Sequence, residues 1–385
     1  MGTYCKLKVN GYDIFEIKND YQSEVINLIF DESDFLVKQF DGDDYISKKF
    51  ISTAGICKKK LEIYGNNLSK TKNDFNIALK KYKDEYEVIF NNESEISFKN
   101  YQKIIETSIN KGIKNYGDCD DYFSLNFQEF ITSNNFGIPN QKLECLLWSI
   151  FDSIDEDIEI VYDLTFIIEA GWITNNPEKE LDFQKIIILT EGKTDTEFIK
   201  KGINLFYPFL NLRYHFMDFE NSNYESNASR LVQTVKAFVG SGVKNKIIAL
   251  FDNDTAGIKE INNLKRTKLP ENIKIFTYPH NSLAVNYPTQ GPNGLSLMNI
   301  NGLGCSIEMY LGEKSLASET SFYPVQWKGY DDKLGQYQGE VKDKKTIQKN
   351  FRDLYKNKII TNDNAALELP ELKNIIDLIL NSWNK

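Results

Sequence analysis

The chain has 385 residues, enough to bury a large core, and this length suggests two or three domains. Its hydrophobic content of 41% is ordinary for a folded protein and excludes wholesale disorder. The net charge of −9 argues against a protein that coats nucleic acid by charge alone. It does not argue against a metal site, because the acids of such a site are neutralised when cations bind.

The apolar runs and the cysteines exclude further classes of protein. No apolar stretch approaches the length of a membrane span, and no basic segment followed by an apolar one opens the chain, so we expect no membrane association. The five cysteines are scattered and form no C-x-x-C pair, which disfavours a zinc ribbon or a disulfide framework. A reducing cytoplasm is the expected location.

The first half of the chain predicts a β-hairpin followed by helices. Apolar and polar residues alternate on both sides of Asn10-Gly11, the strongest short-range signal for a hairpin. Apolar residues at helical spacing dominate afterwards, and Asn175–Glu178 has the composition of a linker. We therefore expect a hairpin region over residues 1–50 and a helical domain over residues 51–179.

From residue 185 onward, strand and helix patterns alternate. Ile186–Leu189 and Ile247–Phe251 are continuous apolar runs, typical of strands buried on both faces of a parallel sheet. Further strands are predicted at Tyr214–Phe219 and Ile273–Tyr278, with amphipathic helices between. This order predicts an α/β domain, a mostly parallel sheet flanked by helices, over residues 180–320.

Two segments follow the last of these strands. Pro279–Gly304 contains four Gly and three Pro residues and predicts a long loop, whose glycines would serve as the hinges of a gate. Residues 321–385 predict a basic, helical extension. Its basic side chains form either a solvated helix face, the favoured interpretation, or a contact for phosphates. They are Lys342, Lys344, Lys345, Lys349 and Arg352.

Carboxylates follow two of the predicted buried strands: Glu191 follows the first, and Asp252 and Asp254 follow another. The carboxyl ends of parallel strands form the edge at which ligands bind, so we expect these groups to lie close together. Acids at positions i and i+2 of an extended backbone point to the same side, which suits them to share one cation. An oxygen-lined pocket fits Mg²⁺ or Mn²⁺. The alternative, that the acids only cap the next helix, is less favoured.

This pattern resembles the Toprim domain of topoisomerases, primases and OLD-family nucleases. Glu191 matches the family's Glu after the first strand, and Asp252 and Asp254 match its Asp-x-Asp. In OLD-type nucleases a second acid comes four residues after the first Glu, as Asp195 does, and a later Glu matches Glu308. The resemblance implies a second metal ligated by Asp195 and Glu308.

Some of these assignments have structural alternatives. Thr194 and Glu197 match a capping box, and an acid such as Asp195 is favoured by the dipole in a first helical turn. Glu308 also precedes a predicted helix, where an acid is favoured without binding a metal. Asp218 and Glu220, at the end of the intermediate strand, are less favoured candidates for supporting groups.

A basic residue and three short segments extend the resemblance. OLD-type enzymes use a basic residue against the transition state, and Lys344 fits that place, although Lys342 and Lys345 fit the spacing equally well. The chain's opening residues and two later segments look like bacterial proteins described as HEPN/Toprim-associated. These segments are Met1–Cys5, Asn286–Pro292 and Tyr337–Glu340.

Other catalytic motifs are missing from the sequence. A HEPN ribonuclease needs an Arg followed closely by a His, and Arg213 precedes His215 only on a predicted strand. A phosphate-binding P-loop ending in Gly192-Lys193-Thr194 would need Gly where Ile187 stands. We therefore expect no HEPN catalysis and no ATPase activity of the chain itself.

The resemblance implies a metal-dependent endonuclease that hydrolyses phosphodiesters with two Mg²⁺ or Mn²⁺ ions, and a role in bacterial anti-phage defence. Glu191, Asp252 and Asp254 would hold one ion, and general acid–base work is a second role for Glu191. The implied partners are nucleic acid, with DNA favoured over tRNA, a separate ATPase or sensor protein, and further copies of the chain. Two alternatives are a ribonuclease acting on tRNA and a regulatory or partner-binding module on a Toprim scaffold.

Overall fold

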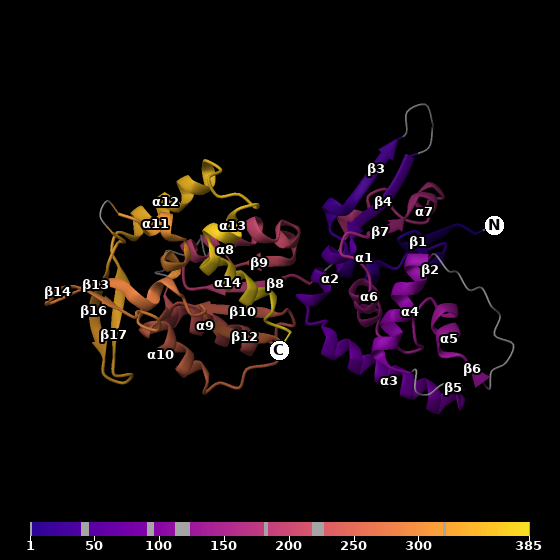
Figure 1. Cartoon of the computed structure of the whole chain (residues 1–385), viewed down its shortest axis with the longest axis horizontal. Coiled ribbons are helices and arrows are strands. Elements are labelled where there is room, and N and C mark those ends of the chain that lie inside the picture. The colour runs from indigo at the N-terminus through magenta and orange to yellow at the C-terminus, as the bar shows by residue number, and fades with distance from the viewer. Residues whose placement is uncertain are drawn as a thin grey trace. The chain divides into compact units, whose positions relative to one another are not determined.

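The computed structural model describes residues 2–39, 46–90, 96–111, 124–180, 184–217, 227–318 and 321–384. Contacts divide the chain into two compact units (Figure 1). The first comprises Met1–Phe183 with Trp383–Lys385, and the second comprises Gln184–Ser382. No helix in the described part of the chain is long and apolar enough to cross a membrane.

The first unit contains a five-stranded antiparallel sheet in the order β2-β1-β7-β4-β3. Its strands are β1 (Tyr4–Val9), β2 (Tyr12–Lys18), β3 (Phe35–Gln39), β4 (Ile46–Thr53) and β7 (Glu159–Asp163). The expected hairpin is confirmed, because β1 and β2 pair around Asn10 and Gly11. Both turn residues have positive φ, the backbone conformation that a two-residue hairpin turn of this kind requires.

Helices of the first unit surround an apolar core that includes Phe75, Tyr101 and Trp148. They are α1 (Ser23–Ile29), α2 (Ala54–Glu62), α3 (Leu68–Tyr86), α4 (Phe98–Lys111), α5 (Phe127–Ser133), α6 (Leu143–Asp152) and α7 (Thr165–Glu169), with the short strands β5 (Ile89–Phe90) and β6 (Ser124–Leu125). The expected separation of a hairpin region from a helical domain is not observed, because β7 pairs with both β1 and β4. Those partners lie more than a hundred residues earlier, so local periodicity could not indicate the pairing.

The second unit contains the expected parallel sheet, in the order β12-β10-β8-β9. Its strands are β8 (Ile186–Thr190), β9 (Tyr214–Phe216), β10 (Ile247–Phe251) and β12 (Ile273–Thr277). Helices α9 (Ala228–Ser241) and α10 (Thr255–Leu264) cover one face through a shared apolar cluster. Helix α8 (Lys193–Phe206) packs on β8 and is covered by α14 (Pro370–Leu380). The predicted alternation of strands and helices is confirmed, although β9 is shorter than expected; Asp218 and Glu220 lie outside the described residues.

The segment Pro279–Gly304 is not the loop that its Gly and Pro content predicted. It forms β13 (Tyr287–Gly291) and β14 (Gly294–Met298), an antiparallel hairpin, and then the short strand β15 (Gly304–Cys305). Tyr287 and Thr289 are buried while β14 is exposed, a half-buried pattern that glycine and proline obscure in the sequence. The prediction of a structureless loop is therefore wrong, and three of the four glycines expected as hinges, Gly291, Gly294 and Gly304, lie in paired strands.

The expected boundary at residue 320 also cuts through a sheet. Strands β16 (Val325–Asp331) and β17 (Gln336–Val341) join the hairpin in the order β14-β13-β16-β17. Only then does the predicted helical extension begin. The remaining elements are β11 (Asn253–Asp254), α11 (Glu313–Leu316), α12 (Lys344–Lys356), α13 (Ala365–Glu368) and the 3₁₀ helices η1 (Glu32–Asp34), η3 (Pro177–Glu180), η4 (Pro208–Arg213), η5 (Leu283–Asn286) and η6 (Ile307–Tyr310).

Candidate functional site

Glu191 and Asp252 meet where two adjacent parallel strands end. Strands β8 and β10 pair in register, which brings the residues that follow them to one edge of the sheet. The Glu191 Oε1 accepts a hydrogen bond of 2.9 Å from the backbone N–H of Asp252. Gly257 allows this arrangement, because a Cβ at that position would lie 2.3 Å from the carbonyl oxygen of Asp252.

Asp252 and Asp254 differ in their hydrogen bonds. Asp254 caps α10, its Oδ1 accepting from the backbone N–H of Gly257 at 2.8 Å, and its Oδ2 accepts from the Gln338 side chain at 2.7 Å. The capping role considered for Asp254 is therefore present. The buried Oδ1 of Asp252 has no hydrogen-bond partner among the residues that the structure describes. Leaving such an acceptor unpaired is costly, so this oxygen is the atom of the site that most needs a ligand.

Asp195 is buried in the first turn of α8, and its Oδ1 accepts a hydrogen bond of 2.7 Å from the Tyr278 hydroxyl. The expected capping box is not formed: Gly192 is the N-cap of the helix and has no side-chain cap. Glu197, the fourth residue of that motif, instead pairs with Arg352.

Glu308 lies on the short helix η6 and is 2% exposed. Its carboxylate accepts hydrogen bonds from the Ser306 hydroxyl at 2.6 Å and from the Gln348 side chain at 2.7 Å. Gln348 lies one helical turn after Lys344 on α12, so the two side chains lie on the same face of that helix.

Lys344 interacts electrostatically with the candidate acids Glu308 and Asp252. Burial alone would lower the pKa of Lys344, but the charges of Glu308, Asp252 and Glu340 raise it above its usual value. Its Nζ lies 3.4 Å from Glu340. Lys342 instead donates to the Gln290 side chain, and Lys345 is exposed. The geometry thus separates three lysines that the spacing left equivalent.

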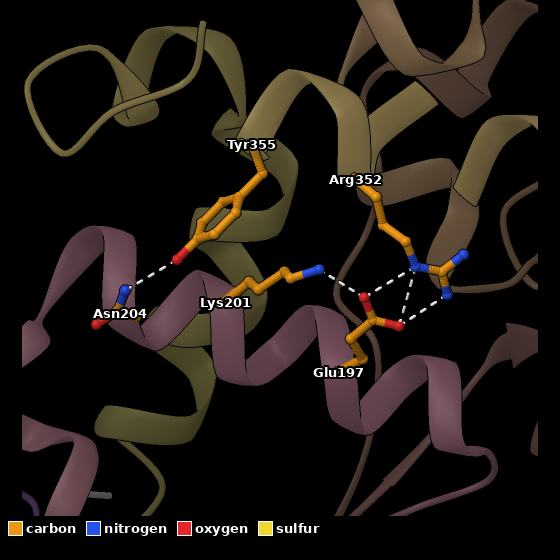
Figure 2. Close-up of polar contacts among 5 residues, drawn as sticks. All are labelled: Glu197, Lys201, Asn204, Arg352 and Tyr355. Carbon is orange, nitrogen blue, oxygen red and sulfur yellow. Dashed lines mark hydrogen bonds and ion pairs between the residues drawn. The ribbon is translucent and has the colours of Figure 1, made fainter. Parts of the chain in front are cut away.

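A polar network docks α12, which bears Lys344, on α8, which bears Asp195 (Figure 2). Arg352 donates two parallel hydrogen bonds to Glu197, from Nε to Oε1 at 2.9 Å and from Nη2 to Oε2 at 2.7 Å. This fork lowers the pKa of Glu197 to about 2. Figure 2 also shows Tyr355 accepting a hydrogen bond from the Asn204 side chain on α8, at 2.9 Å.

The candidate acids form one electrostatic cluster. Burial raises the pKa of Glu191 to about 8, and the charges of Asp254 and Asp195 add to this effect. Burial likewise raises the pKa of Asp195 to about 6, with a contribution from Glu308. Burial raises the pKa of Asp252 well above its usual range, and that of Asp254 also rises. A cation that binds among these buried carboxyl groups would stabilise their ionised forms and lower their pKa values.

The donor set fits a hard divalent cation in its chemistry, because all five acids offer oxygen and Asp252 has a buried oxygen to spare. Over the described ranges, however, no group of three or more His, Cys, Asp or Glu side chains is arranged to hold a metal ion. Hydrogen bonds hold the other acids in their present orientations. Binding a cation would therefore require some of these bonds to be exchanged for metal ligation.

Four side chains that the sequence did not single out donate hydrogen bonds to the candidate acids: those of Tyr278, Ser306, Gln338 and Gln348. Tyr278 ends a predicted strand at the same sheet edge, and Gln348 follows Lys344 by one helical turn, so their positions could have indicated them. Gln338 belongs to a segment already noted for its resemblance, but its contact with Asp254 spans 84 residues and was not predictable from spacing.

The first unit of the chain is similar to a known protein family. Residues 1–187 match the family described as HEPN/Toprim N-terminal domain 1. No curated protein and no solved structure matches the chain. The match supports the resemblance to HEPN/Toprim-associated proteins. It ends within β8, so all candidate site residues, from Glu191 to Lys344, lie beyond it.

Proposed function

We propose that this protein is a divalent-metal-dependent nuclease with a Toprim-like catalytic unit of the OLD type. The observation that carries the proposal is a cluster of buried acids beside the carboxyl edge of a parallel sheet, in which the buried Oδ1 of Asp252 has no partner in the described part of the chain. The family match of residues 1–187 supports it. A role in anti-phage defence is part of the proposal and rests on the resemblance alone.

In the proposed site, Glu191, Asp252 and Asp254 hold one Mg²⁺ or Mn²⁺ ion, and Asp195 with Glu308 holds a second. Bound metals of this kind activate water and stabilise the charge on a leaving oxygen. Lys344 stabilises negative charge on the phosphate. Burial raises the pKa of Glu191 to about 8 without metal, so Glu191 would give up its proton when it binds the ion.

Hydrogen-bonded neighbours keep the acids oriented. Tyr278 holds Asp195, Gln338 holds Asp254, and Gln348 holds Glu308. The acids repel phosphate until cations fill the site, so we expect substrate binding to depend on metal. We expect DNA to be preferred to tRNA, with a separate ATPase or sensor protein as the activating partner.

The test is incubation of the purified protein with plasmid DNA, single-stranded DNA and total tRNA, each with Mg²⁺, Mn²⁺ or EDTA. Cleavage that requires the metal and is lost in Asp252→Asn supports the proposal. Cleavage of tRNA alone would favour the ribonuclease alternative. No cleavage of any substrate, by a protein that also fails to bind Mn²⁺, would overturn the proposal and favour the regulatory module.

A further inference from the structure

A groove lies between the β13–β14 hairpin and the β16–β17 hairpin of the second unit. Figure 1 shows both hairpins extending from the part of this unit that contains the parallel sheet. The groove has a volume of about 780 Å³, within the range of ligand-binding pockets. Its lining contains a lysine, Lys328, and no acidic side chain, in a chain with a net charge of −9.

Three aromatic side chains line this groove: Trp327, Tyr330 and Tyr337. The Tyr337 ring contacts both others, with centroid separations of 5.9 Å to Trp327 and 4.8 Å to Tyr330. Residues 327 and 330 would point to opposite faces of a regular strand, but an irregularity between Trp327 and Gly329 brings them to the same one. Tyr330 is 53% exposed and Tyr337 is 56% exposed, so their rings are open to a ligand.

Gly339 makes room for the Trp327 indole between the hairpins, and Gly291 contacts the indole at an ordinary distance. A Cβ at Gly339 would lie 3.2 Å from the indole Cζ3, and a Cβ at Gly291 would lie 3.7 Å from its Cδ1. The indole thus lies over β17 and beside the end of β13. The amide side chains of Asn293 and Gln326 add hydrogen-bonding groups to the same groove.

The groove and the acidic site share one strand. Gln338, the neighbour of Tyr337 on β17, points the other way and donates to Asp254. The hydroxyl of Thr255, next to Asp254, donates to the backbone carbonyl of Tyr337 at 2.7 Å. A chain molecule held against the Tyr337 ring would therefore lie on the face of β17 opposite to the one from which Gln338 reaches Asp254.

We propose that this groove binds single-stranded nucleic acid, whose unpaired bases stack on Tyr330, Tyr337 and Trp327. Stacking on protein aromatics requires bases that are free of a duplex, and it tolerates any sequence. Lys328 is half exposed and lies 3.5 Å from Glu340, so it would exchange this solvent-exposed ion pair for a contact with a phosphate. As a statement about substrate, the inference rests on the proposed nuclease function and makes single strands its substrate class. As a statement about binding, it stands alone.

The binding test uses fluorescence anisotropy with oligo-dT, oligo-U and a duplex of equal length, on the full chain carrying Asp252→Asn to prevent cleavage. We expect both single strands to bind more tightly than the duplex. Tyr330→Ala with Tyr337→Ala should weaken single-strand binding at least about tenfold, because each stacked base is worth a factor of about 5 to 150. Tyr330→Phe with Tyr337→Phe should restore it, since stacking needs only the ring.

Tyr86→Ala is the matched control. Tyr86 is 58% exposed and also stands in a tyrosine pair, with Tyr82 at 5.1 Å, but it belongs to the first unit. Its loss should leave binding unchanged. Lys328→Ala should reduce the slope of log affinity against log salt by about 0.7, the value for one phosphate contact on a single strand.

Hydrolysis of a small phosphodiester without bases tests the proposed nuclease function independently of binding in the groove. Bis(p-nitrophenyl) phosphate has no bases, so its metal-dependent hydrolysis by the parent protein tests the chemistry without the groove. Absence of this hydrolysis and of nucleic-acid cleavage, with single-strand binding that depends on Tyr330 and Tyr337, would reject the nuclease and keep the groove. Single-strand binding unchanged in the alanine variant, or duplex preferred over single strands, would overturn the groove whatever the hydrolysis shows. The DNA and RNA oligonucleotides decide between the two sugars.

Discussion

Two aspartates only two residues apart illustrate how differently neighbouring acids are held. Asp254 caps α10, whereas the Oδ1 of Asp252 is buried without a partner in the described residues. We expect Asp252→Asn to reduce cleavage more than about a hundredfold, above the usual cost of losing a group that merely supports a ligand. The melting temperature of this variant without metal should stay the same or rise, because the cost of burying an ionisable carboxyl group is removed.

Asp254→Ala should also abolish cleavage, but it removes the cap and should lower the free energy of unfolding by about 0.5–2 kcal/mol. Differential scanning calorimetry in EDTA beside a nuclease assay measures both variants. Parental cleavage by Asp252→Asn would contradict the role given to this residue.

Raised carboxyl pKa values predict a pH dependence of stability. Glu191 has a pKa of about 8 and Asp195 of about 6 when folded, so the folded chain holds protons that the unfolded chain has already lost. The free energy of unfolding without metal should therefore fall as the pH rises from about 4.5 to 8. We expect a lower melting temperature in EDTA at pH 8 than at pH 6, and a smaller difference in Glu191→Gln.

Metal binding should show the opposite trend, because ligands must lose their protons to bind a cation. Affinity for Mn²⁺, measured by calorimetric titration, should rise over the same range of pH. Stability that rises with pH in EDTA, or affinity that falls, would contradict the electrostatic description of the cluster.

Among the structural elements, α10 lies unusually close to the backbone that bears the acids. A methyl group at Gly257 would meet the carbonyl oxygen of Asp252 at 2.3 Å, and this atom cannot move without disturbing the Asp252–Glu191 contact. Gly257→Ala should lower the free energy of unfolding by about 1–3 kcal/mol and impair cleavage.

Gly240→Ala is the control for this substitution. Gly240 lies in α9 with no heavy atom near its Cβ position, so alanine there should raise the free energy of unfolding by up to about 1 kcal/mol. Urea unfolding of both variants provides the measurement. Equal effects of the two substitutions would show that close approach is not what Gly257 provides.

The contact between α8 and α12 makes a second prediction for the elements. Arg352 and Glu197 form a forked pair, but their side chains are 41% and 33% exposed, so solvent screens the interaction. A double-mutant cycle with Arg352→Gln and Glu197→Gln should give a coupling free energy of about 0.2–1 kcal/mol, smaller at high salt. A coupling near zero would mean that apolar packing, such as Phe198 against Phe351, holds α12 in place instead.

At the scale of the whole molecule, we predict that the two units have different roles, metal binding in the second and partner binding or self-association in the first. All candidate site residues belong to the second unit, and the family match covers the first. We expect residues 184–382, expressed alone, to bind Mn²⁺ like the full chain but to lose regulated or substrate-positioned cleavage. We propose that the first unit receives the partner or forms a homo-oligomer.

Calorimetric titration of Mn²⁺ into the fragment and the full chain, with circular dichroism to verify folding, tests this division. Loss of metal binding by a well-folded fragment would show that the first unit contributes to the site. Analytical ultracentrifugation of the two proteins would show whether association depends on the first unit.

Sequence periodicity predicted the local elements and failed where pairing is distant. The strands around Ile186–Leu189 and Ile247–Phe251, and the turn at Asn10-Gly11, follow from residues adjacent in the chain. Strand β7 and the β13–β14 hairpin were missed, because their strand identity depends on partners or burial that their own composition does not indicate.

The sequence by itself determined that Glu191, Asp252 and Asp254 stand at the ends of buried strands, because a short apolar run followed by acids has few other solutions. Only the tertiary structure decided that Asp195, Glu308 and Lys344 join them electrostatically, and that Lys344 rather than Lys342 does so. The physical reason is distance along the chain: contacts such as Tyr278 with Asp195 and Gln338 with Asp254 close loops of more than eighty residues. Such contacts depend on how whole elements pack, and no local pattern encodes them.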